Sequence, residues 1–403
     1  MNQHHWLLPE YIEDLLPPVA LRMESLRHAM LNLFRLHGYE LVAPPMIEYL
    51  DSLLSGTGSD LDLNTFKLVD QLSGKSMGLR ADITPQTARI DAHLLNRQGV
   101  TRLCYAGEVV RTLPERTNRS RELTQLGAEL YGHTGYEADV EIQKIMLAAL
   151  KLAGVTDLHL DMGHVGVFRG LLHYAGINDD QAAPLFAALQ AKDTATISQL
   201  TRHVDPISQA AFCALPTLYG GEDVLERAFQ ILPSHIEISQ ALEQLRAMVN
   251  EIKTGVTLNI DLAELRGYHY HSGVMFAVYT SHHPAPLASG GRYDDVGKQF
   301  GRARPATGFS LDLRELSRQF PRQTAKAAIL APYLKNAKLM ARIDELRNSG
   351  ERVIIDLPGH DNDRHEYDVD RNLVANAQGE WTIAPYANPD ISQIDARPHL
   401  SID

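Results

Sequence analysis

Two polar side chains spaced four residues apart stand in an otherwise apolar strand-like segment of the chain. Gln125 and Glu129 occur in the run TQLGAE, with Gly127 between them. In a strand, an even spacing places both side chains on one face, where an amide and a carboxylate can bind the polar groups of a ligand. Gly127 would leave room for that ligand. The same alternation is also typical of a solvated strand face, so the pair alone leaves both interpretations open.

A second group of polar residues occupies residues 265–273, which read LRGYHYHSG. Arg266 offers a cation, and Tyr270 and His271 can each donate or accept a hydrogen bond. His269 and His271 alternate as two metal ligands on a strand would. Two ligands without a third are weak support for a metal site, so we expect no metal and no cofactor here.

Glycines follow in the run SGGRYD, where Gly290 and Gly291 precede Arg292. Glycine permits the backbone to approach a ligand closely, although the run also fits an ordinary turn. A further candidate is the segment around Asp82, where Thr84 is predicted to be the N-cap of a helix with Pro85 at its first position.

The elements that must position these residues alternate between helices and strands. Apolar spacing and glycine stops predict helices at 19–37 and 140–153, and a helical block from about 179 to 253 that matches no strand template. Strands are predicted at 39–45, 158–162, 256–262, 275–279 and 307–311, with a hairpin between 67 and 80 that turns at Ser73–Lys75.

The C-terminal part reads as a separate module. A polar, proline-containing stretch at 318–324 is a plausible linker, and a strand, helix and strand follow at 327–332, 337–348 and 352–357. We therefore expect a core over residues 1–320, with a helical insertion at about 175–255, and a small α/β module over 321–403. A chain of 403 residues is long enough for two or three domains.

Composition excludes several classes of protein. The hydrophobic fraction of 44% and charged fraction of 22% are normal for a globular protein. Two cysteines far apart, no secretory signal and no long apolar run fit a cytoplasmic protein without disulfides or membrane spans. The formal net charge is −12. A protein that holds tRNA normally needs a basic face, so we expect no tRNA partner.

The run from Leu103 to Glu129, LCYAGEVVRTLPERTNRSRELTQLGAE, resembles the second signature motif of class II aminoacyl-tRNA synthetases, and most closely that of histidyl-tRNA synthetase. The segments RGYHYH and GGRYD resemble the histidine-specific segment and the glycine-rich strand of the same family. The resemblance implies an α+β fold, in which an antiparallel sheet is flanked by helices, with a helical insertion and a small C-terminal α/β domain. It also implies a homodimer.

In that family these motifs bind histidine, and the resemblance assigns roles by position. Asp82, where the family usually has Glu, and Thr84 would hold the α-amino group. Gln125 would contact the backbone of the amino acid, and Glu129 would accept a hydrogen bond from the imidazole. Arg111 and Arg266 would bind the carboxylate. Tyr270 and His271 would complete the contacts to the imidazole, and Gly290 and Gly291 would form the pocket floor.

The nucleotide half of the resemblance is damaged. Arg111 matches the arginine that contacts the α-phosphate of ATP, but Leu113 stands where the family has the Glu that fixes adenine. In the third motif, Glu315 stands at the position of an adenine-binding arginine and Asp312 at that of a glycine. Carboxylates near a triphosphate repel it. Arg314 is adjacent but, on a helix, should point elsewhere.

This pattern of loss resembles the regulatory subunits of ATP phosphoribosyltransferase, which are synthetase paralogues. The resemblance implies a non-catalytic subunit that activates a short-form catalytic subunit in a hetero-oligomer and relays feedback inhibition by histidine, at the first step of histidine biosynthesis. An active histidyl-tRNA synthetase and a histidine-binding regulator of another partner remain alternatives at this point.

Overall fold

The computed structural model describes residues 7–54, 59–114, 120–252, 255–268, 270–319, 326–360, 364 and 366–386. The chain divides into two compact units, Met1–Pro321 and Arg322–Asp403. No helix among the described residues is long and apolar enough to cross a membrane.

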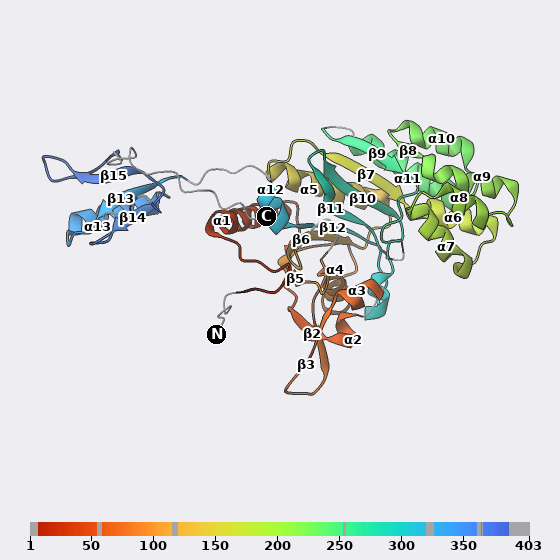
Figure 1. The fold of residues 1–403 in the computed structure, drawn as a ribbon, viewed down its shortest axis with the longest axis horizontal. Coiled ribbons are helices and arrows are strands. Elements are labelled where there is room, and N and C mark those ends of the chain that lie inside the picture. The colour runs from red at the N-terminus through yellow and green to blue at the C-terminus, as the bar shows by residue number, and fades with distance from the viewer. Residues whose placement is uncertain are drawn as a thin grey trace. The chain divides into compact units, whose positions relative to one another are not determined.

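A nine-stranded sheet forms the centre of the first unit (Figure 1). Its middle strands pair antiparallel, from β5 through β6, β12, β11 and β10 to β7, while β1–β5 and β7–β9 are parallel. In spatial order the strands are β1 (Glu40–Leu41), β5 (Thr101–Val110), β6 (Glu122–Tyr131), β12 (Ala306–Asp312), β11 (His283–Arg292), β10 (Val274–Thr280), β7 (His159–His164), β9 (Thr257–Asp261) and β8 (Tyr219–Gly220).

Helices pack on this sheet through apolar faces. On one side, α5 contacts β10, β11 and β12, while α1 contacts β5. Phe34 of α1 meets Phe309 of β12 edge to face, with ring centroids 5.9 Å apart, and both side chains are buried. The helices of this layer are α1 (Pro17–Leu36), α5 (Tyr136–Leu152) and α12 (Leu313–Gln319). A short helix and a π-helix follow the predicted Asp82 segment, α4 (Thr84–Arg89) and η1 (Ile90–Leu95).

The helical insertion and a small sheet complete the first unit. The insertion comprises α6 (Val165–Ala175), α7 (Asp179–Gln190), α8 (Thr194–Leu200), α9 (Pro206–Ala214), η2 (Leu215–Thr217), α10 (Asp223–Ile231) and α11 (Ile236–Ile252). The small sheet has the order β2-β4-β3, from β2 (Ile47–Tyr49), β4 (Ser76–Leu79) and β3 (Phe66–Val69). Short helices α2 (Leu50–Leu53) and α3 (Ser59–Asn64) lie between β2 and β3 in the chain, and η3 (Val296–Phe300) lies between β11 and β12.

The second unit is a four-stranded sheet with one helix, in the order β14-β13-β15-β16. The predicted strand–helix–strand is present and its strands are parallel, but two strands that the sequence did not predict extend the sheet. The elements are β13 (Ala328–Pro332), α13 (Ala337–Asn348), β14 (Val353–Asp356), β15 (Val369–Ala375) and β16 (Trp381–Pro385). Leu339, Ile343 and Leu346 of α13 fill a core against Ile329, Val353 and Leu373.

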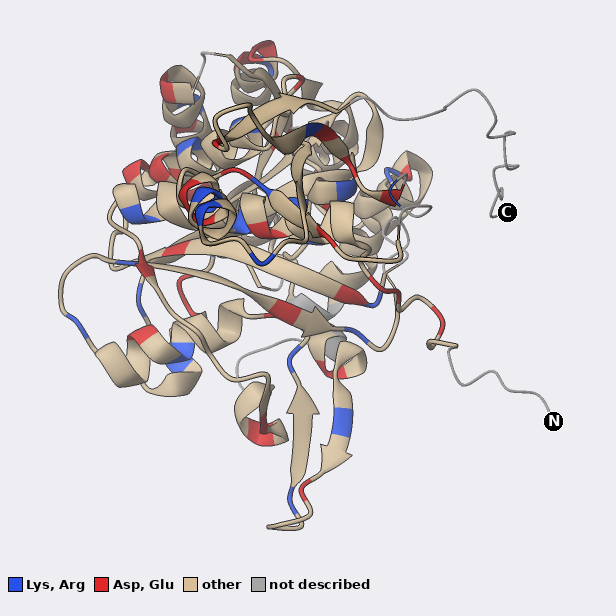
Figure 2. Ribbon diagram, turned by 90° about the vertical axis from the view of Figure 1, so that its left-hand side faces the viewer, with Lys and Arg blue, Asp and Glu red and all other residues tan. Residues whose placement is uncertain are grey.

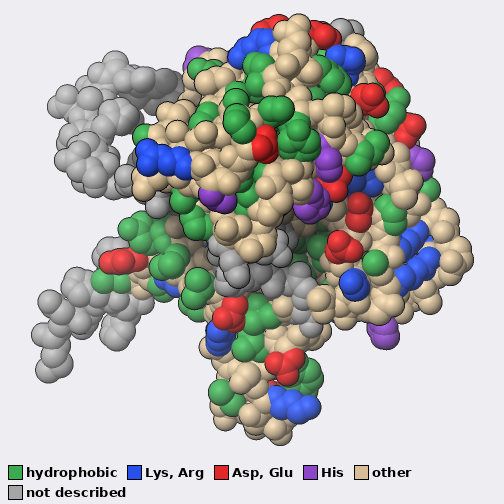
Figure 3. Space-filling view, turned by 90° about the vertical axis from the view of Figure 1, so that its right-hand side faces the viewer, with side chains coloured by type: hydrophobic (Ala, Val, Ile, Leu, Met, Phe, Trp, Pro, Cys, Tyr) green, Lys and Arg blue, Asp and Glu red, His purple; other side chains and the backbone are tan. Residues whose placement is uncertain are grey.

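Charged residues of both signs are interspersed along the ribbon in Figure 2. Acidic, basic and hydrophobic side chains also alternate over the face shown in Figure 3, which carries no large area of basic side chains. The described residues of the face in Figure 3 therefore show no continuous basic stripe of the kind that would track a phosphate backbone.

Gly290, near the end of β11, is required by the packing of the sheet. A Cβ at this position would lie 2.1 Å from the carbonyl oxygen of Gly308 and 2.8 Å from the Cα of Phe309. Because both obstacles are backbone atoms of the paired strand, they cannot move aside. We expect Gly290→Ala to lower the free energy of unfolding by about 3 kcal/mol, as measured by urea denaturation.

The control is Gly99→Ala, because a Cβ at Gly99 meets no atom within 4 Å and the residue is exposed. That variant should unfold like the parent. Equal stability of the two variants would show that the strands around Gly290 can move apart to admit a methyl group without lowering the free energy of unfolding.

Candidate functional site

Gln125 and Glu129 lie on one face of β6 and are buried, with 7% and 1% of their surface exposed. The common-face prediction is confirmed, and the alternative of a solvated strand face is wrong. Both side chains are buried because β6 is an interior strand, paired with β5 on one side and with β12 on the other. Buried polar groups of this kind need partners, and the partners define the site.

Glu129 is held by two tyrosines. The Tyr105 hydroxyl donates to Glu129 Oε1 at 3.0 Å, and the Tyr293 hydroxyl donates to Oε2. Gly308 faces the carboxyl across the strand pair, and a Cβ there would lie 1.5 Å from Oε2. Burial raises the pKa of Glu129 to about 8, and the two hydroxyl donors only partly oppose that rise. Glu129 is therefore largely protonated at pH 7.

Asp82, Thr84 and Gln125 form one hydrogen-bonded group. Gln125 Nε2 donates to Asp82 Oδ1 at 2.8 Å, and the backbone N–H of Thr84 donates to the same oxygen at 2.9 Å. The Ile83 N–H donates to Gln125 Oε1 at 2.9 Å. The prediction that Thr84 caps α4 is wrong: the helix begins at Thr84, its N-cap is Ile83, and Asp82 holds the turn through a side-chain bond two residues on. The Thr84 hydroxyl is 3.1 Å from the Tyr105 hydroxyl instead.

The role expected of Gly127 needs a correction. A Cβ at Gly127 would lie 2.5 Å from both the Tyr105 hydroxyl oxygen and the carbonyl oxygen of Phe309. The glycine therefore makes room for Tyr105 and not for a ligand. Tyr105 lies opposite Gly127 in the β5–β6 register.

Tyr270 and His271 form another wall of the site. The Tyr270 ring lies 5.2 Å from that of Tyr293, and its buried hydroxyl has no hydrogen-bond partner among the described residues. His271 Nδ1 is 3.0 Å from the carbonyl oxygen of Gly267, and burial lowers the pKa of the imidazole. A Cβ at Gly291 would lie 2.4 Å from the His271 ring. His269 lies outside the described residues.

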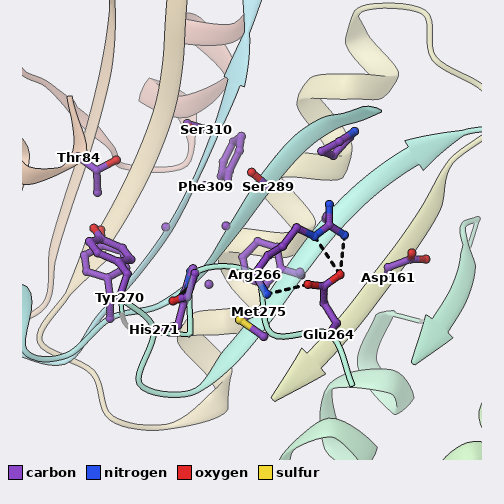
Figure 4. A pocket seen from close by; sticks show the side chains of 18 of the residues that line it. Thr84, Asp161, Glu264, Arg266, Tyr270, His271, Met275, Ser289, Phe309 and Ser310 are labelled. Atoms are coloured by element: carbon purple, nitrogen blue, oxygen red, sulfur yellow. Dashed lines mark hydrogen bonds and ion pairs between the residues drawn. The ribbon is translucent and has the colours of Figure 1, made fainter. Parts of the chain in front are cut away.

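Arg266 is engaged by a neighbour that the sequence did not single out. Its Nε and Nη2 atoms donate to Glu264 Oε2 at 2.9 and 2.6 Å, and Nη2 also donates to the Tyr279 hydroxyl at 2.5 Å. In Figure 4 the guanidinium faces Glu264, away from Thr84 and Tyr270.

These residues surround a cavity of about 510 Å³. Six of the eight residues predicted to bind the amino acid line it, together with the two glycines predicted as its floor: Asp82, Thr84, Glu129, Arg266, Tyr270, His271, Gly290 and Gly291. The other two, Gln125 and Arg111, line an adjoining cavity of about 140 Å³. Pro286, Ser289 and Ser310 line both cavities, so the two are neighbours.

The adjoining cavity, called the second cavity below, contains charges of both signs. Asp312 and Glu315 line it with Arg111 and His283. His283 Nε2 lies 3.3 Å from Glu315 Oε1, and the Asp312 carboxylate accepts from the N–H groups of Thr124 and Arg314 at 3.2 and 3.0 Å. Burial lowers the pKa of Arg111, an effect that the charges of Asp82 and Asp312 oppose.

Two features of the damaged nucleotide motifs have the geometry predicted. Arg314 does not line the second cavity but pairs with Glu122, with Nη2 and Oε2 3.0 Å apart. Strand β12 pairs with β6 and β11 without a register shift, so no bulge brings Arg314 to the position of Glu315. Leu113, which stands where the family has the Glu that fixes adenine, is 64% exposed.

Sequence reasoning missed Tyr105, Tyr293 and Glu264. Tyr293 belongs to the quoted GGRYD run, and Tyr105 to the quoted second motif, so both lay within the motifs but carried no assigned role. Among the described residues, no group of three or more His, Cys, Asp or Glu side chains is arranged to hold a metal ion.

The fold and the cavity identify the class of protein. A histidyl-tRNA synthetase family profile matches residues 11–316. The solved structure of an ATP phosphoribosyltransferase regulatory subunit/histidyl-tRNA synthetase from Bacillus halodurans C is similar with a TM-score of 0.80 at 26% identity, covering 91% of this chain and 98% of that one. A histidyl-tRNA synthetase from Nostoc sp. PCC 7120 has the same fold, with a TM-score of 0.76 at 18% identity and coverage of 94% and 97%. The chain is a histidyl-tRNA synthetase-like protein of class II fold, as predicted.

Relatives with higher sequence identity identify the family within this class. ATP phosphoribosyltransferase regulatory subunits from Ralstonia pickettii and Cupriavidus necator are 57% and 55% identical, over 94% and 95% of this chain and 98% and 99% of theirs. The profile of the ATP phosphoribosyltransferase subunit HisZ C-terminal domain matches residues 326–384. This chain belongs to the ATP phosphoribosyltransferase regulatory subunit family.

The raised pKa of Glu129 predicts a pH dependence of stability. Between the ordinary carboxyl pKa of 4.5 and about 8, the folded protein keeps a proton that the unfolded chain has lost, so this contribution to stability falls as pH rises. We expect the free energy of unfolding to fall between pH 6 and pH 8.5 by roughly 2 kcal/mol more in the parent than in Glu129→Gln. Urea denaturation at both pH values measures the difference, and identical falls would contradict a protonated Glu129.

Proposed function

We propose that this chain is a non-catalytic regulatory subunit that binds free histidine in the main cavity and relays its feedback inhibition to a short-form ATP phosphoribosyltransferase catalytic subunit, which it also activates. The names of its relatives support the assembly. The observation that carries the histidine assignment is the buried Glu129 carboxyl, which faces a cavity beside a Tyr270 hydroxyl that has no hydrogen-bond partner among the described residues.

The main cavity offers a complement to each part of histidine. Asp82 and the Thr84 hydroxyl suit the ammonium, Arg266 suits the carboxylate, and Glu129 with Tyr270 and His271 suit the two ring nitrogens. Glu129 and the Tyr270 hydroxyl are buried, so a polar ring that satisfies them is favoured over an apolar side chain of similar size. Gly290 and Gly291 contribute no side chain to the cavity wall.

The second cavity is poorly suited to the triphosphate of ATP. A triphosphate needs cations, whereas Asp312 and Glu315 both line this cavity with carboxylates and Arg111 already interacts with the charges of Asp82 and Asp312. The proposal therefore includes loss of aminoacylation activity. It also includes a homodimer within a hetero-oligomer, a cytoplasmic location, and the absence of tRNA and cofactors.

Calorimetric titration tests the ligand assignment. We expect the purified protein to release heat on titration with histidine and to give little heat with ATP, because the main cavity has polar groups for each part of histidine and the second cavity carries two carboxylates. Glu129→Leu should weaken histidine binding about tenfold or more, since it removes a buried acceptor. Heat with ATP comparable to that with histidine, together with histidine-dependent charging of tRNA, would instead indicate an active synthetase.

Inhibition assays test the regulatory role. In the complex with a short-form catalytic subunit, we expect Glu129→Leu and Arg266→Ala to shift histidine inhibition to concentrations about tenfold higher, while activation of the partner stays near the parent level. Glu137→Gln is the matched control, because this carboxylate is exposed and lines neither cavity. If both cavity variants are inhibited like the parent, histidine acts elsewhere.

A further inference from the structure

The only Arg or Lys among the described residues that line the main cavity is Arg266, and it is already bound to a carboxylate. Glu264 accepts from Nε and Nη2 of Arg266 through one oxygen, at 2.9 and 2.6 Å. The second oxygen of Glu264 accepts from the backbone N–H of Arg266 at 2.7 Å. The Tyr279 hydroxyl accepts a further bond from Nη2 at 2.5 Å.

The remaining acidic side chains of the cavity favour cations. Asp82, Asp161 and Glu264 line it, and the fourth carboxyl, that of Glu129, is largely neutral at pH 7 because burial raises its pKa. While Arg266 stays on Glu264, the described residues that line the cavity present no uncommitted guanidinium or ammonium group to a ligand carboxylate. An imidazole with an ammonium group would fit this arrangement, but the carboxylate of histidine would need Arg266 to change partner.

We propose that Glu264 is an internal competitor for the ligand carboxylate, so that Arg266 binds either Glu264 or the amino acid and Glu264 thereby sets the selectivity between histidine and its decarboxylated analogue. This inference rests on the proposed function, since it concerns the same cavity. It assigns Glu264 as a specificity-determining residue that need not touch the ligand itself.

The local geometry allows the exchange. The backbone bond to Arg266 N–H anchors Glu264 through its other oxygen, so the carboxylate keeps its place when the guanidinium leaves. The side chain of Arg266 is 58% exposed and that of Glu264 is 26% exposed, which screens their attraction. Burial raises the pKa of Glu264, but the hydrogen bonds and charge of Arg266 outweigh it and the net pKa is lowered, so Glu264 is an anion at neutral pH. A screened pair of this kind is one that a second carboxylate can displace.

Titration of three proteins with histidine and with histamine tests the competition. The proteins are the parent, Glu264→Gln and Asp161→Asn. We expect Glu264→Gln to raise the ratio of histidine affinity to histamine affinity about fivefold, because it frees Arg266 for a carboxylate. Asp161→Asn also removes a carboxyl from the cavity wall, but the hydrogen bond of Asp161 is to Asn259, and its interaction with Arg266 is coulombic only. It should change both affinities in parallel and leave their ratio within twofold.

Tyr279→Phe is a second test that leaves the Glu264 loop intact. It removes one of the three side-chain bonds that hold the guanidinium, so the affinity ratio should rise by less than in Glu264→Gln. A crystal structure with histidine should show Arg266 off Glu264, whereas one with histamine should show the pair retained.

The outcomes separate the two proposals. If the parent binds histidine but the ratio is unchanged in both Glu264→Gln and Tyr279→Phe, the competition is wrong and the histidine site stands. If only Glu264→Gln binds histidine, the competition is supported and feedback by histidine in the parent is contradicted. If no variant binds histidine, both proposals fail.

Discussion

The arrangement of the site depends on one buried carboxyl group. Glu129 is 1% exposed, and its two oxygens are occupied by hydroxyls from Tyr105 on β5 and Tyr293 after β11. A buried carboxyl is costly unless it is hydrogen-bonded or neutral, and here both conditions are met. The buried Glu129 carboxyl also limits which residues can occupy neighbouring positions in the sheet. Gly308 must lack a side chain to admit the carboxyl, and Gly127 must lack one to admit Tyr105. The space and the hydrogen bonds that Glu129 requires thus hold β5, β6 and β12 in one register.

Residue patterns within a single segment predicted the helices and strands that have their own apolar periodicity. They failed to predict strands that form by pairing with a neighbouring strand. The helices α1, α5 and α13 and the β3–β4 hairpin each span twenty residues or fewer, and they follow from apolar spacing, glycine stops and a turn. By contrast β8 has two residues, and β15 and β16 are partly exposed strands that depend on pairing, β15 with β13 and β16 with β15. Such strands carry little apolar periodicity of their own.

The same limit explains which site residues were found. Asp82, Glu129, Arg266 and Tyr270 stand at motif positions, and the structure gathers them around one cavity. The contributions of Tyr105 and Gly127 depend on their being opposite one another in the β5–β6 register, which no spacing within one strand reveals. Glu264 was overlooked because its partner, Arg266, was expected to face a ligand. Sequence alone does not show that a carboxylate two residues away in a loop accepts two hydrogen bonds from the guanidinium.

The acidic character of the second cavity is part of the fold and not a single lost side chain. Asp312 ends β12, and its carboxylate bonds the N–H groups of Thr124 and Arg314, so it joins β6 to the first turn of α12. Glu315 lies in the same first turn of α12 and pairs with His283. Reversal of the charge at Glu315 alone would therefore leave a structural carboxylate in place beside Arg111. Under the proposed function, loss of the nucleotide site and retention of the amino-acid site have separate physical causes: the first follows from the end of β12 and the second from Glu129. A change at one end of the shared strands leaves the other intact, which is the separation that a sensor derived from a synthetase requires.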